Sequence, residues 1–445
     1  MKTKLLNFWE NLRSTYWFLP SLLAVLAIVL AMVTIQLDEY LLLQQANSLP
    51  WLYTGGPEGA RSLLSTVAGS MITVAGVTFS ITIVALTLAS SQFGPRLLNN
   101  FIRDRGNQIV LGTFIATFVY CLLILRTVRS EAGNSFVPPI SISISFLLAL
   151  ASLGVLIYFI HHISSSMNVE NVIAAIERDL DQAIERLFPK HKSFQFFEQE
   201  LREEDDIPQD FEQSAQPVTA SKNGYVQAID HEGLLELAKT QDLLLRLEYR
   251  PGNFVTEGNA LALAWPGDRL NGDPMESIND AFIVGAQRLQ MQDVEFAINQ
   301  LVEIAVRALS PGVNDPFTAM ACLDRLGAAL SNLAERTIPS AYHYDNDNNL
   351  RLIGQSVTFA GIVDTAFNQI RQYGRSSVAV STRLLETITV IAAHTHTPAE
   401  RTALRRQASM TRLGAMESVP EAMDRQDIEA QYQLALKVLE QTQEV

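Results

Sequence analysis

Charged side chains are missing from four long stretches in the first part of this 445-residue chain. Residues 17–35, 62–93, 109–125 and 140–160 contain no Asp, Glu, Lys or Arg. Each stretch is apolar and close to or above the roughly 20 residues that a helix needs to cross a ~30 Å hydrocarbon layer. We therefore predict four transmembrane helices. Ion-coupled transporters usually hold an ionisable group at membrane depth, so this absence counts against a secondary transporter.

Cysteine and catalytic motifs are also scarce. The two cysteines, Cys121 and Cys322, are too few for a disulfide framework, and we expect Cys322 to pack as a small apolar side chain. The chain contains no Gly-x-Ser-x-Gly, Gly-Lys-Ser/Thr or His-Glu-x-x-His sequence. The histidines at 161–162 and 394–396 lack the spacing of zinc ligands. The sequence thus predicts no enzyme, no cofactor and no metal site.

Positive charge is in deficit, with 33 Lys and Arg against 47 Asp and Glu and a formal net charge of −14. This balance argues against a nucleic-acid partner. Near the predicted spans, six basic residues lie in the amino-terminal tail and second connector, and three lie in the opposite loops: Lys2, Lys4, Arg13, Arg96, Arg103 and Arg105 against Arg61, Arg126 and Arg129. The excess predicts that both termini are cytoplasmic. The first span is longer than a usual signal core and three more follow, so we expect it to be retained.

The second apolar stretch, 62–93, carries a regular stripe of small and hydroxyl residues. The stripe consists of Ser62, Thr66, Gly69, Thr73, Gly76, Ser80, Thr87 and Ser90. Up to Ser80, the spacing of four and three residues places them on one face of a helix. Small residues let membrane helices approach closely, and hydroxyls find partners across a helix interface. Two interpretations stay open: a helix in the middle of the chain's own bundle, or a pore-lining or subunit-contacting helix.

A basic connector follows this stretch, from Pro95 to Gly106. Proline is favoured at a first helical position and glycine where a helix ends, so we predict a short amphipathic helix at the membrane surface. Its arginines, Arg96, Arg103 and Arg105, would form a collar that raises the local anion concentration at an inner pore mouth. A cation preference also stays open, because the predicted exposed loop 38–60 on the opposite side contains the acids Asp38, Glu39 and Glu58.

The remainder of the chain is predicted to be cytoplasmic and of mixed α+β structure. Our predicted divisions are a four-span transmembrane domain (1–165), a helical stalk and acidic linker (166–215), a small β-barrel-like module (216–270) and a helical domain (271–445). The module is predicted from short runs of β-forming residues separated by turns. It is similar to the barrel-sandwich modules of lipoyl and biotin carriers, but no turn presents the lysine that a carrier needs. We therefore expect a structural or interaction module.

The helical domain contains one conspicuous turn, from Arg307 to Thr318. Pro311-Gly312 breaks one helix, Asp315 is placed to cap the next, and Pro316 takes its first position, which explains the sequence without a ligand. The alternative is an anion or small-ligand pocket formed by Arg307, Ser310, Asn314 and Asp315, with the free amides of the new helix.

Two runs resemble a known family. Residues 76–96, from Gly76-Val77-Thr78-Phe79-Ser80-Ile81 to Ser90-Ser91-Gln92-Phe93-Gly94-Pro95-Arg96, and residues 307–316, from Arg307-Ala308-Leu309-Ser310-Pro311 to Asn314-Asp315-Pro316, are similar to bacterial predicted membrane proteins catalogued as domain of unknown function 2254. The resemblance spans nearly the whole chain. It implies a protein of the bacterial inner membrane and carries over no catalytic residue.

Our leading functional hypothesis is a homo-oligomeric ion channel in the lipid bilayer, with Thr66, Gly69, Thr73, Gly76, Ser80 and Thr87 lining the pore and the cytoplasmic region regulating it. Its partners would be further copies of the chain and inorganic ions. The alternative is a membrane-anchored scaffold or sensor whose cytoplasmic domain binds a partner, with the stripe used only for packing.

Overall fold

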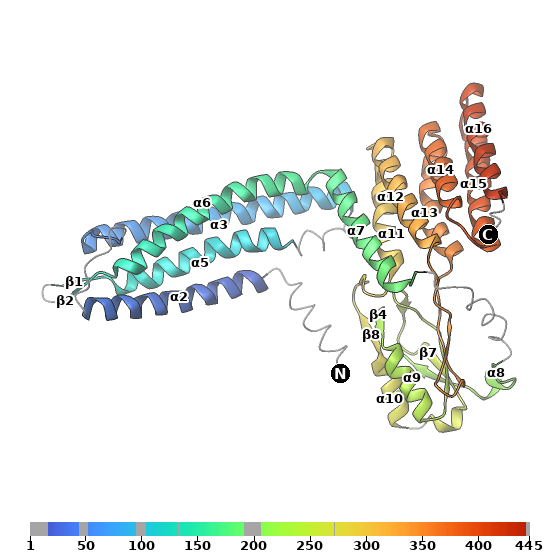
Figure 1. Cartoon of the computed structure of the whole chain (residues 1–445), viewed down its shortest axis with the longest axis horizontal. Coiled ribbons are helices and arrows are strands. Elements are labelled where there is room, and N and C mark those ends of the chain that lie inside the picture. The colour runs from blue at the N-terminus through green and yellow to red at the C-terminus, as the bar shows by residue number, and fades with distance from the viewer. Residues whose placement is uncertain are drawn as a thin grey trace. The chain divides into compact units, whose positions relative to one another are not determined.

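A computed structural model describes residues 17–43, 52–94, 104–131, 134–190, 206–270 and 272–441. The amino-terminal tail and most of the basic connector, including Arg96 and Arg103, lie outside these residues. The chain forms two compact units, Met1–Asn171 and Val172–Val445, which are described in turn as unit 1 and unit 2 (Figure 1).

Unit 1 consists of four long helices and a small hairpin. The helices are α2 (Phe18–Leu43), α3 (Pro57–Phe93), α5 (Arg105–Thr127) and α6 (Pro139–Ser166), and the hairpin pairs β1 (Arg129–Glu131) with β2 (Asn134–Phe136). All four helices are long and apolar enough to cross a membrane, which confirms the predicted four apolar helices. The prediction of an exposed loop starting at Asp38 is wrong, because α2 continues to Leu43 and Asp38 is buried.

Helix α5 is the centre of unit 1. It packs against α2, α3 and α6. Its buried face includes Val110, Phe114, Tyr120 and Ile124. The interpretation that the second apolar helix, now α3, occupies the middle of the bundle is therefore wrong.

Close approach of α2 and α5 depends on Gly112. A Cβ atom at this position would lie 2.6 Å from Leu23 Cδ1 and 3.0 Å from the backbone Cα of Pro20. The absence of a side chain thus allows the two helices to touch at backbone distance, as small residues do in other membrane bundles.

Unit 2 begins with α7 (Val169–Leu187), which crosses the boundary between the two units. Within unit 2, α7 packs through Ile173, Ile176 and Leu180, which are buried. Glu177 of α7 pairs with Arg325 at 3.0 Å. The helix predicted at the start of the 166–215 segment is confirmed, and from Val172 on it belongs to the compact part of unit 2.

The strands of unit 2 form two sheets. One sheet has five strands in the order β3-β7-β5-β10-β9, and the other has three in the order β6-β4-β8. The strands are β3 (Gln216–Thr219), β4 (Gly224–Ile229), β5 (Leu244–Leu247), β6 (Phe254–Val255), β7 (Ala260–Trp265), β8 (Phe282–Gly285), β9 (Tyr342–Tyr344) and β10 (Leu350–Ile353). All pairs are antiparallel except β5 with β10. Short helices α8 (Phe211–Ser214), α9 (His231–Thr240) and α10 (Asp273–Ala281) and a 3₁₀ turn, η3 (Gly267–Arg269), connect them.

The predicted β-barrel-like module at 216–270 is not confirmed, since no closed barrel is present among the residues that the structure describes. The physical reason is that strands from outside this range complete the sheets. Strand β10 occupies one edge of β5, and β8 occupies one edge of β4. Val226, Leu245 and Ala262 are among the buried residues of the core that both sheets share with α9 and α10.

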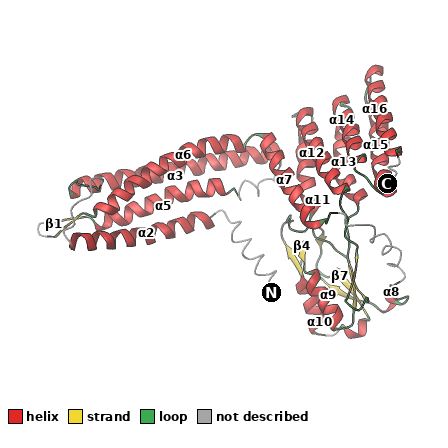
Figure 2. Ribbon diagram, viewed as in Figure 1, coloured by secondary structure: helices red, strands yellow, loops and turns green. Residues whose placement is uncertain are grey.

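The other helices of unit 2 pack beside one another as a helical bundle (Figure 2). They are α11 (Val294–Ala308), α12 (Pro316–Ala334), α13 (Phe359–Gly374), α14 (Val378–Ala392), α15 (Pro398–Ser418) and α16 (Ala422–Glu440). The helical structure predicted for this part of the chain is confirmed in these six helices, whose ends have clear local signals, although β8, β9 and β10 also lie within 271–445. Thr397, for example, forms a capping box with Glu400 just before Pro398 opens α15.

Candidate functional site

Helix α3 has two faces made largely of small residues, and in the part of the chain that the structure describes only one of them is buried. The face buried in unit 1 consists mainly of alanines: Ala60, Leu64, Ala68, Ala75, Thr78, Thr82, Ala85 and Ala89. The predicted stripe lies on the other side, where Ser62, Thr66, Gly69, Thr73, Gly76, Ser80 and Thr87 are exposed and Ser90 is half-buried. Packing within the chain therefore leaves the stripe open.

The hydroxyl groups of the stripe bond to their own helix. Thr66 donates to the carbonyl of Ser62 at 2.7 Å, Thr73 to Gly69 at 2.8 Å and Ser80 to Gly76 at 2.9 Å. Each hydroxyl hydrogen is thereby used, while the oxygen keeps lone pairs that face outward. A Cβ atom at Gly69 or Gly76 would meet nothing within 4 Å. The stripe thus presents an exposed face of small residues and acceptor oxygens.

Unit 1 also contains a buried polar cluster that sequence analysis missed. The Asp38 carboxylate accepts the backbone N–H of Ile140 at 2.8 Å, the N–H of Ser141 at 2.9 Å and the Ser141 hydroxyl at 2.6 Å. Tyr120 donates to the Ser141 carbonyl at 3.1 Å, and its hydroxyl lies 3.0 Å from that of Thr34. Asp38 therefore caps α6 from another helix. The sequence did contain a sign that α2 extends past Asp38, because the apolar run Leu41-Leu42-Leu43 follows this acid.

The other end of unit 1 holds the described part of the basic connector. Arg105 is the first residue of α5 and is exposed. Gly106 does not end a connector helix, as predicted, but lies in the first turn of α5, where its N–H donates to Asp104 Oδ1 at 2.8 Å. The predicted helix between Pro95 and Arg103 lies outside the described residues, so the collar of Arg96, Arg103 and Arg105 stays a prediction.

The turn between α11 and α12 is closed by hydrogen bonds of its own. The N–H of Asn314 donates to the Ser310 carbonyl at 2.9 Å, and the N–H of Asp315 donates to Ala308 at 2.8 Å. The Asp315 carboxylate accepts the N–H groups of Phe317 and Thr318 at 3.1 and 3.2 Å. An anion at this helix start would have to displace that carboxylate.

Arg307, Ser310, Asn314 and Asp315 lie within one short turn, and several of their polar groups bond to the turn itself or to α11. The Ser310 hydroxyl donates to the Arg307 carbonyl at 2.7 Å, and the Arg307 guanidinium lies 3.9 Å from Glu303. The turn instead presents Val313 and Phe317 outward, with 59% and 77% of their surfaces exposed. The pocket predicted here stays a prediction.

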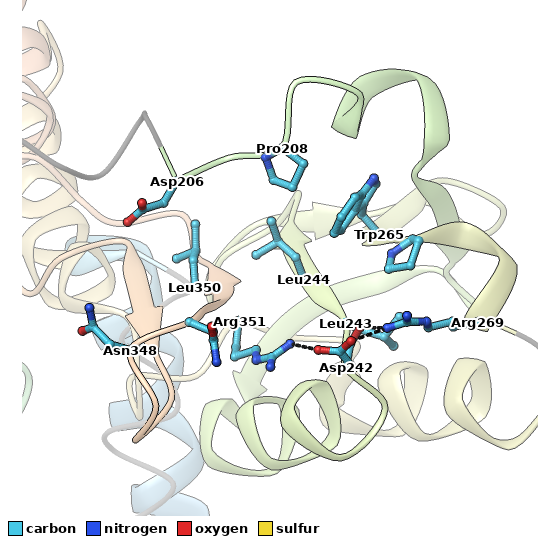
Figure 3. A pocket seen from close by; sticks show the side chains of 12 residues that line it. Asp206, Pro208, Asp242, Leu243, Leu244, Trp265, Arg269, Asn348, Leu350 and Arg351 are labelled. Carbon is cyan, nitrogen blue, oxygen red and sulfur yellow. Dashed lines mark hydrogen bonds and ion pairs between the residues drawn. The ribbon is translucent and has the colours of Figure 1, made fainter.

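A shallow pocket of about 370 Å³ lies elsewhere in unit 2, beside β5 and the β9–β10 turn (Figure 3). Leu244, Leu350 and Trp265 form its apolar part. At its rim, Arg351 and Arg269 both bond to the Asp242 carboxylate, and Arg351 also bonds to Asp345 at 2.8 Å. The hydrogen bonds from Arg351 and then Arg269 lower the pKa of the Asp242 carboxyl. Both guanidinium groups at this rim are therefore already paired with carboxylates.

Neither histidine pair forms a metal site among the residues that the structure describes, in which no cluster of three or more His, Cys, Asp or Glu side chains occurs. His394 Nδ1 lies 2.7 Å from Glu335. His162 contacts Asp104.

Comparison with known proteins places this chain in a family. The model of a family described as "Predicted membrane protein (DUF2254)" matches residues 13–390. The chain belongs to this family. The resemblance inferred from the sequence is thereby confirmed, and the protein is a predicted membrane protein with four apolar helices.

Mycobacterial proteins are similar to this DUF2254 member. The uncharacterized protein Mb1321c of Mycobacterium bovis (strain ATCC BAA-935 / AF2122/97) and the uncharacterized protein Rv1290c of Mycobacterium tuberculosis (strain ATCC 25618 / H37Rv) are each 32% identical to it over 380 residues. The match covers 84% of this chain and 71% of each relative. No solved structure matches the chain.

The two sequence runs that resemble DUF2254 members lie at separate places in the structure. The first contributes the second half of α3 and ends in the connector. The second forms the turn between α11 and α12. One run therefore belongs to the exposed stripe and the other to the turn that carries Val313 and Phe317.

Proposed function

We propose that this protein is a homo-oligomeric ion channel of the bacterial inner membrane, in which α3 lines the pore and unit 2 regulates it. The observation that carries the proposal is the exposure of the stripe. Among the described residues, the chain buries the alanine face of α3 against its own bundle and leaves the hydroxyl and glycine face exposed. A second copy of the same helix is the natural partner for such a face, since most oligomers are symmetric assemblies of one chain.

The chemistry of the stripe suits a weakly binding ion path. Its hydroxyl oxygens and helix carbonyls can replace part of an ion's hydration shell, whereas a ring of charged groups would hold the ion more strongly. Large apolar side chains flank the stripe, among them Ile72, Val77 and Val84, which are all exposed in the single chain. These residues suit contact with lipid or with an adjacent helix.

The proposal includes an orientation with both termini in the cytoplasm, supported by the distribution of Lys and Arg. An anion preference is supported by the basic connector, of which Arg105 is exposed. Asp38 no longer favours cations at the opposite mouth, because its carboxylate is buried in the α6 cap. Glu39 and Glu58 are exposed there. The proposal assigns no catalytic step, cofactor or nucleic-acid partner.

The test is ion flux through purified protein in liposomes, with Thr73→Leu and Gly76→Leu as the pore variants. Because a Cβ atom at Gly76 would meet nothing within 4 Å of its own chain, we expect Gly76→Leu to leave the single chain folded and to act where another copy approaches. The matched control is Val77→Leu on the same helix, where an exposed apolar residue is replaced by another. We expect the pore variants to reduce or block flux and the control to conduct as wild type.

A folded oligomer that conducts no ions across several salts and voltages would favour the second candidate, a membrane-anchored scaffold or sensor. The observation that supports this candidate is the hydrogen-bonded turn that exposes Val313 and Phe317 in unit 2. A strict monomer in detergent would contradict a pore built around a symmetry axis by α3.

A further inference from the structure

Asp104 and His162 form a close pair where α5 begins and α6 ends. The Nε2 atom of His162 lies 2.6 Å from Asp104 Oδ2, and the two side chains are only about one-fifth exposed, at 21% and 20%. The second carboxylate oxygen of Asp104 accepts the N–H of Gly106 and caps α5. One carboxylate thus bonds to both helices.

The imidazole ring of His162 is held by two further contacts. The Tyr158 ring stacks on it with 5.3 Å between centroids and 13° between planes, and the Tyr158 hydroxyl lies 3.5 Å from Nδ1. A Cβ atom at Gly106 would lie only 2.6 Å from Nε2, so the ring fills the space that this glycine leaves. These contacts distinguish the pair from an ordinary exposed ion pair, whose side chains are free to move.

The pair also occupies a special place along the chain. Asp104 follows the connector that leaves α3 at Gly94, and His162 lies near the end of α6, from which the chain continues into α7 and unit 2. A change in the contact would therefore act on the start of α5 and on the last turns of α6.

Among the described residues, few other charges lie near the imidazole in the sequence. On the neighbouring positions, Arg105 and His161 are exposed, and Tyr158 is the titratable group that stacks on the ring. No Asp, Glu, Lys or Arg occurs in the described start of α2, from Trp17, or in the last described turns of α3. Within the described part of the chain, the carboxylate that bonds to His162 is that of Asp104.

We propose that the Asp104–His162 pair is a proton-sensitive latch between α5 and α6 that regulates ion flow along α3. The regulatory part rests on the proposed channel function. Histidine changes charge between about pH 5 and 8, and a hydrogen bond between imidazolium and carboxylate is stronger than one from a neutral imidazole. Protonation tightens the latch, and loss of the proton loosens it.

The experiment compares wild type with His162→Gln and Asp104→Asn between pH 5.5 and 8. Asparagine at position 104 keeps an oxygen that can cap α5, so this variant removes the charge and spares the cap. His161→Gln is the matched control, because it makes the same change at the adjacent exposed histidine. In liposomes, we expect wild-type and control flux to change by roughly threefold or more over this range, and both latch variants to lose the change.

A second measurement keeps the latch separate from the channel. Unfolding of detergent-solubilised wild type, both single variants and the double variant gives the coupling between positions 104 and 162 at each pH. We expect coupling at pH 5.5 that weakens at pH 8. Coupling that is absent at both values overturns the latch itself. Flux whose pH profile is unchanged in both variants overturns the regulation and leaves the channel standing. No flux from any form overturns the channel and its regulation together.

Discussion

The carboxylate of Asp38, in the last part of α2, accepts both the backbone N–H and the hydroxyl of Ser141, in the first turn of α6. A helix start carries several N–H groups that its own helix cannot satisfy, and in an apolar environment each unsatisfied group is costly. Asp38, which is distant in sequence, accepts the backbone N–H groups of both Ile140 and Ser141. It therefore ties two spans that are far apart in sequence.

The first prediction concerns this carboxylate. Asp38→Ala removes three hydrogen bonds and leaves buried donors without partners, so we expect the free energy of unfolding to fall by about 3 kcal/mol. The measurement is unfolding of the detergent-solubilised protein with increasing SDS. Glu39→Ala, at the adjacent exposed acid, is the control and should change stability little. Equal effects at both positions would contradict the capping role.

A second prediction concerns the contact between α2 and α5. Gly112→Ala places a methyl group 3.0 Å from the backbone of Pro20, which can move only if the helices separate. We expect a loss of about 1–3 kcal/mol in the same unfolding assay. Gly154→Ala in α6 is the control, because a Cβ atom there meets nothing within 4 Å. At that position alanine should be neutral or stabilise the helix by roughly 0.5–1 kcal/mol.

A third prediction concerns pH and two histidines of unit 2. The rings of His231, at the start of α9, and His343, on β9, lie 6.0 Å apart. Burial lowers the pKa of both imidazoles, and the neighbouring His343 lowers that of His231 further. The unfolded state therefore binds more protons as the pH falls through about 6.5, so stability is retained above that value and declines below it.

Thermal unfolding of unit 2 within the full chain, followed from pH 8 to pH 5, measures this effect. The double variant His231→Gln, His343→Gln should lose part of the decline below pH 6.5. His396→Gln makes the same change at an exposed histidine and should leave the profile as in wild type. A wild-type stability that is flat over this range would rule out the prediction.

A fourth prediction concerns the two thiols. Cys121 and Cys322 are both fully buried, and burial raises the pKa of the Cys322 thiol far above its usual value. The thiolate is the reactive form, so the folded protein should react very slowly with maleimides and release two reactive thiols on denaturation in SDS. Mass spectrometry counts the labels. As a positive control, a cysteine introduced at Thr73 should react in the folded protein if the stripe is open to water. Rapid labelling of the unaltered folded protein would contradict the burial of Cys121 and Cys322.

Much of the fold could be predicted from local sequence patterns. The four apolar helices and the helices of unit 2 have uncharged runs, periodic apolar positions and clear ends such as Asp315-Pro316 and Thr397-Pro398. The barrel-like module could not be predicted correctly, because its strands pair with segments far along the chain. Leu352 of β10, for example, lies beside Leu245 of β5. No local pattern specifies such a pair.

The candidate site was predictable only in part. The spacing of Thr66, Gly69 and Thr73 predicts that they share a helix face, but it cannot say whether that face packs inside the chain. The answer depends on the second small face, which includes Ala68 and Ala75, and this face is the one buried in unit 1. The role of Asp38 was missed because an acid next to an apolar run normally marks the end of a span. Its carboxylate can be buried because it accepts hydrogen bonds from Ile140 and Ser141, which lie 102 and 103 residues further along the chain.

The central position of α5 has a consequence for biogenesis. During synthesis, α2 and α3 leave the ribosome before α5, yet their main neighbours in the finished bundle are α5 and α6. One small contact of their own is the ring pair Trp17–Phe79, with 6.4 Å between centroids. The first two helices must therefore wait in the lipid or be shielded by the insertion machinery until α5 arrives. Assembly of the bundle completes late in translation, when α6 brings the N–H groups that Asp38 caps.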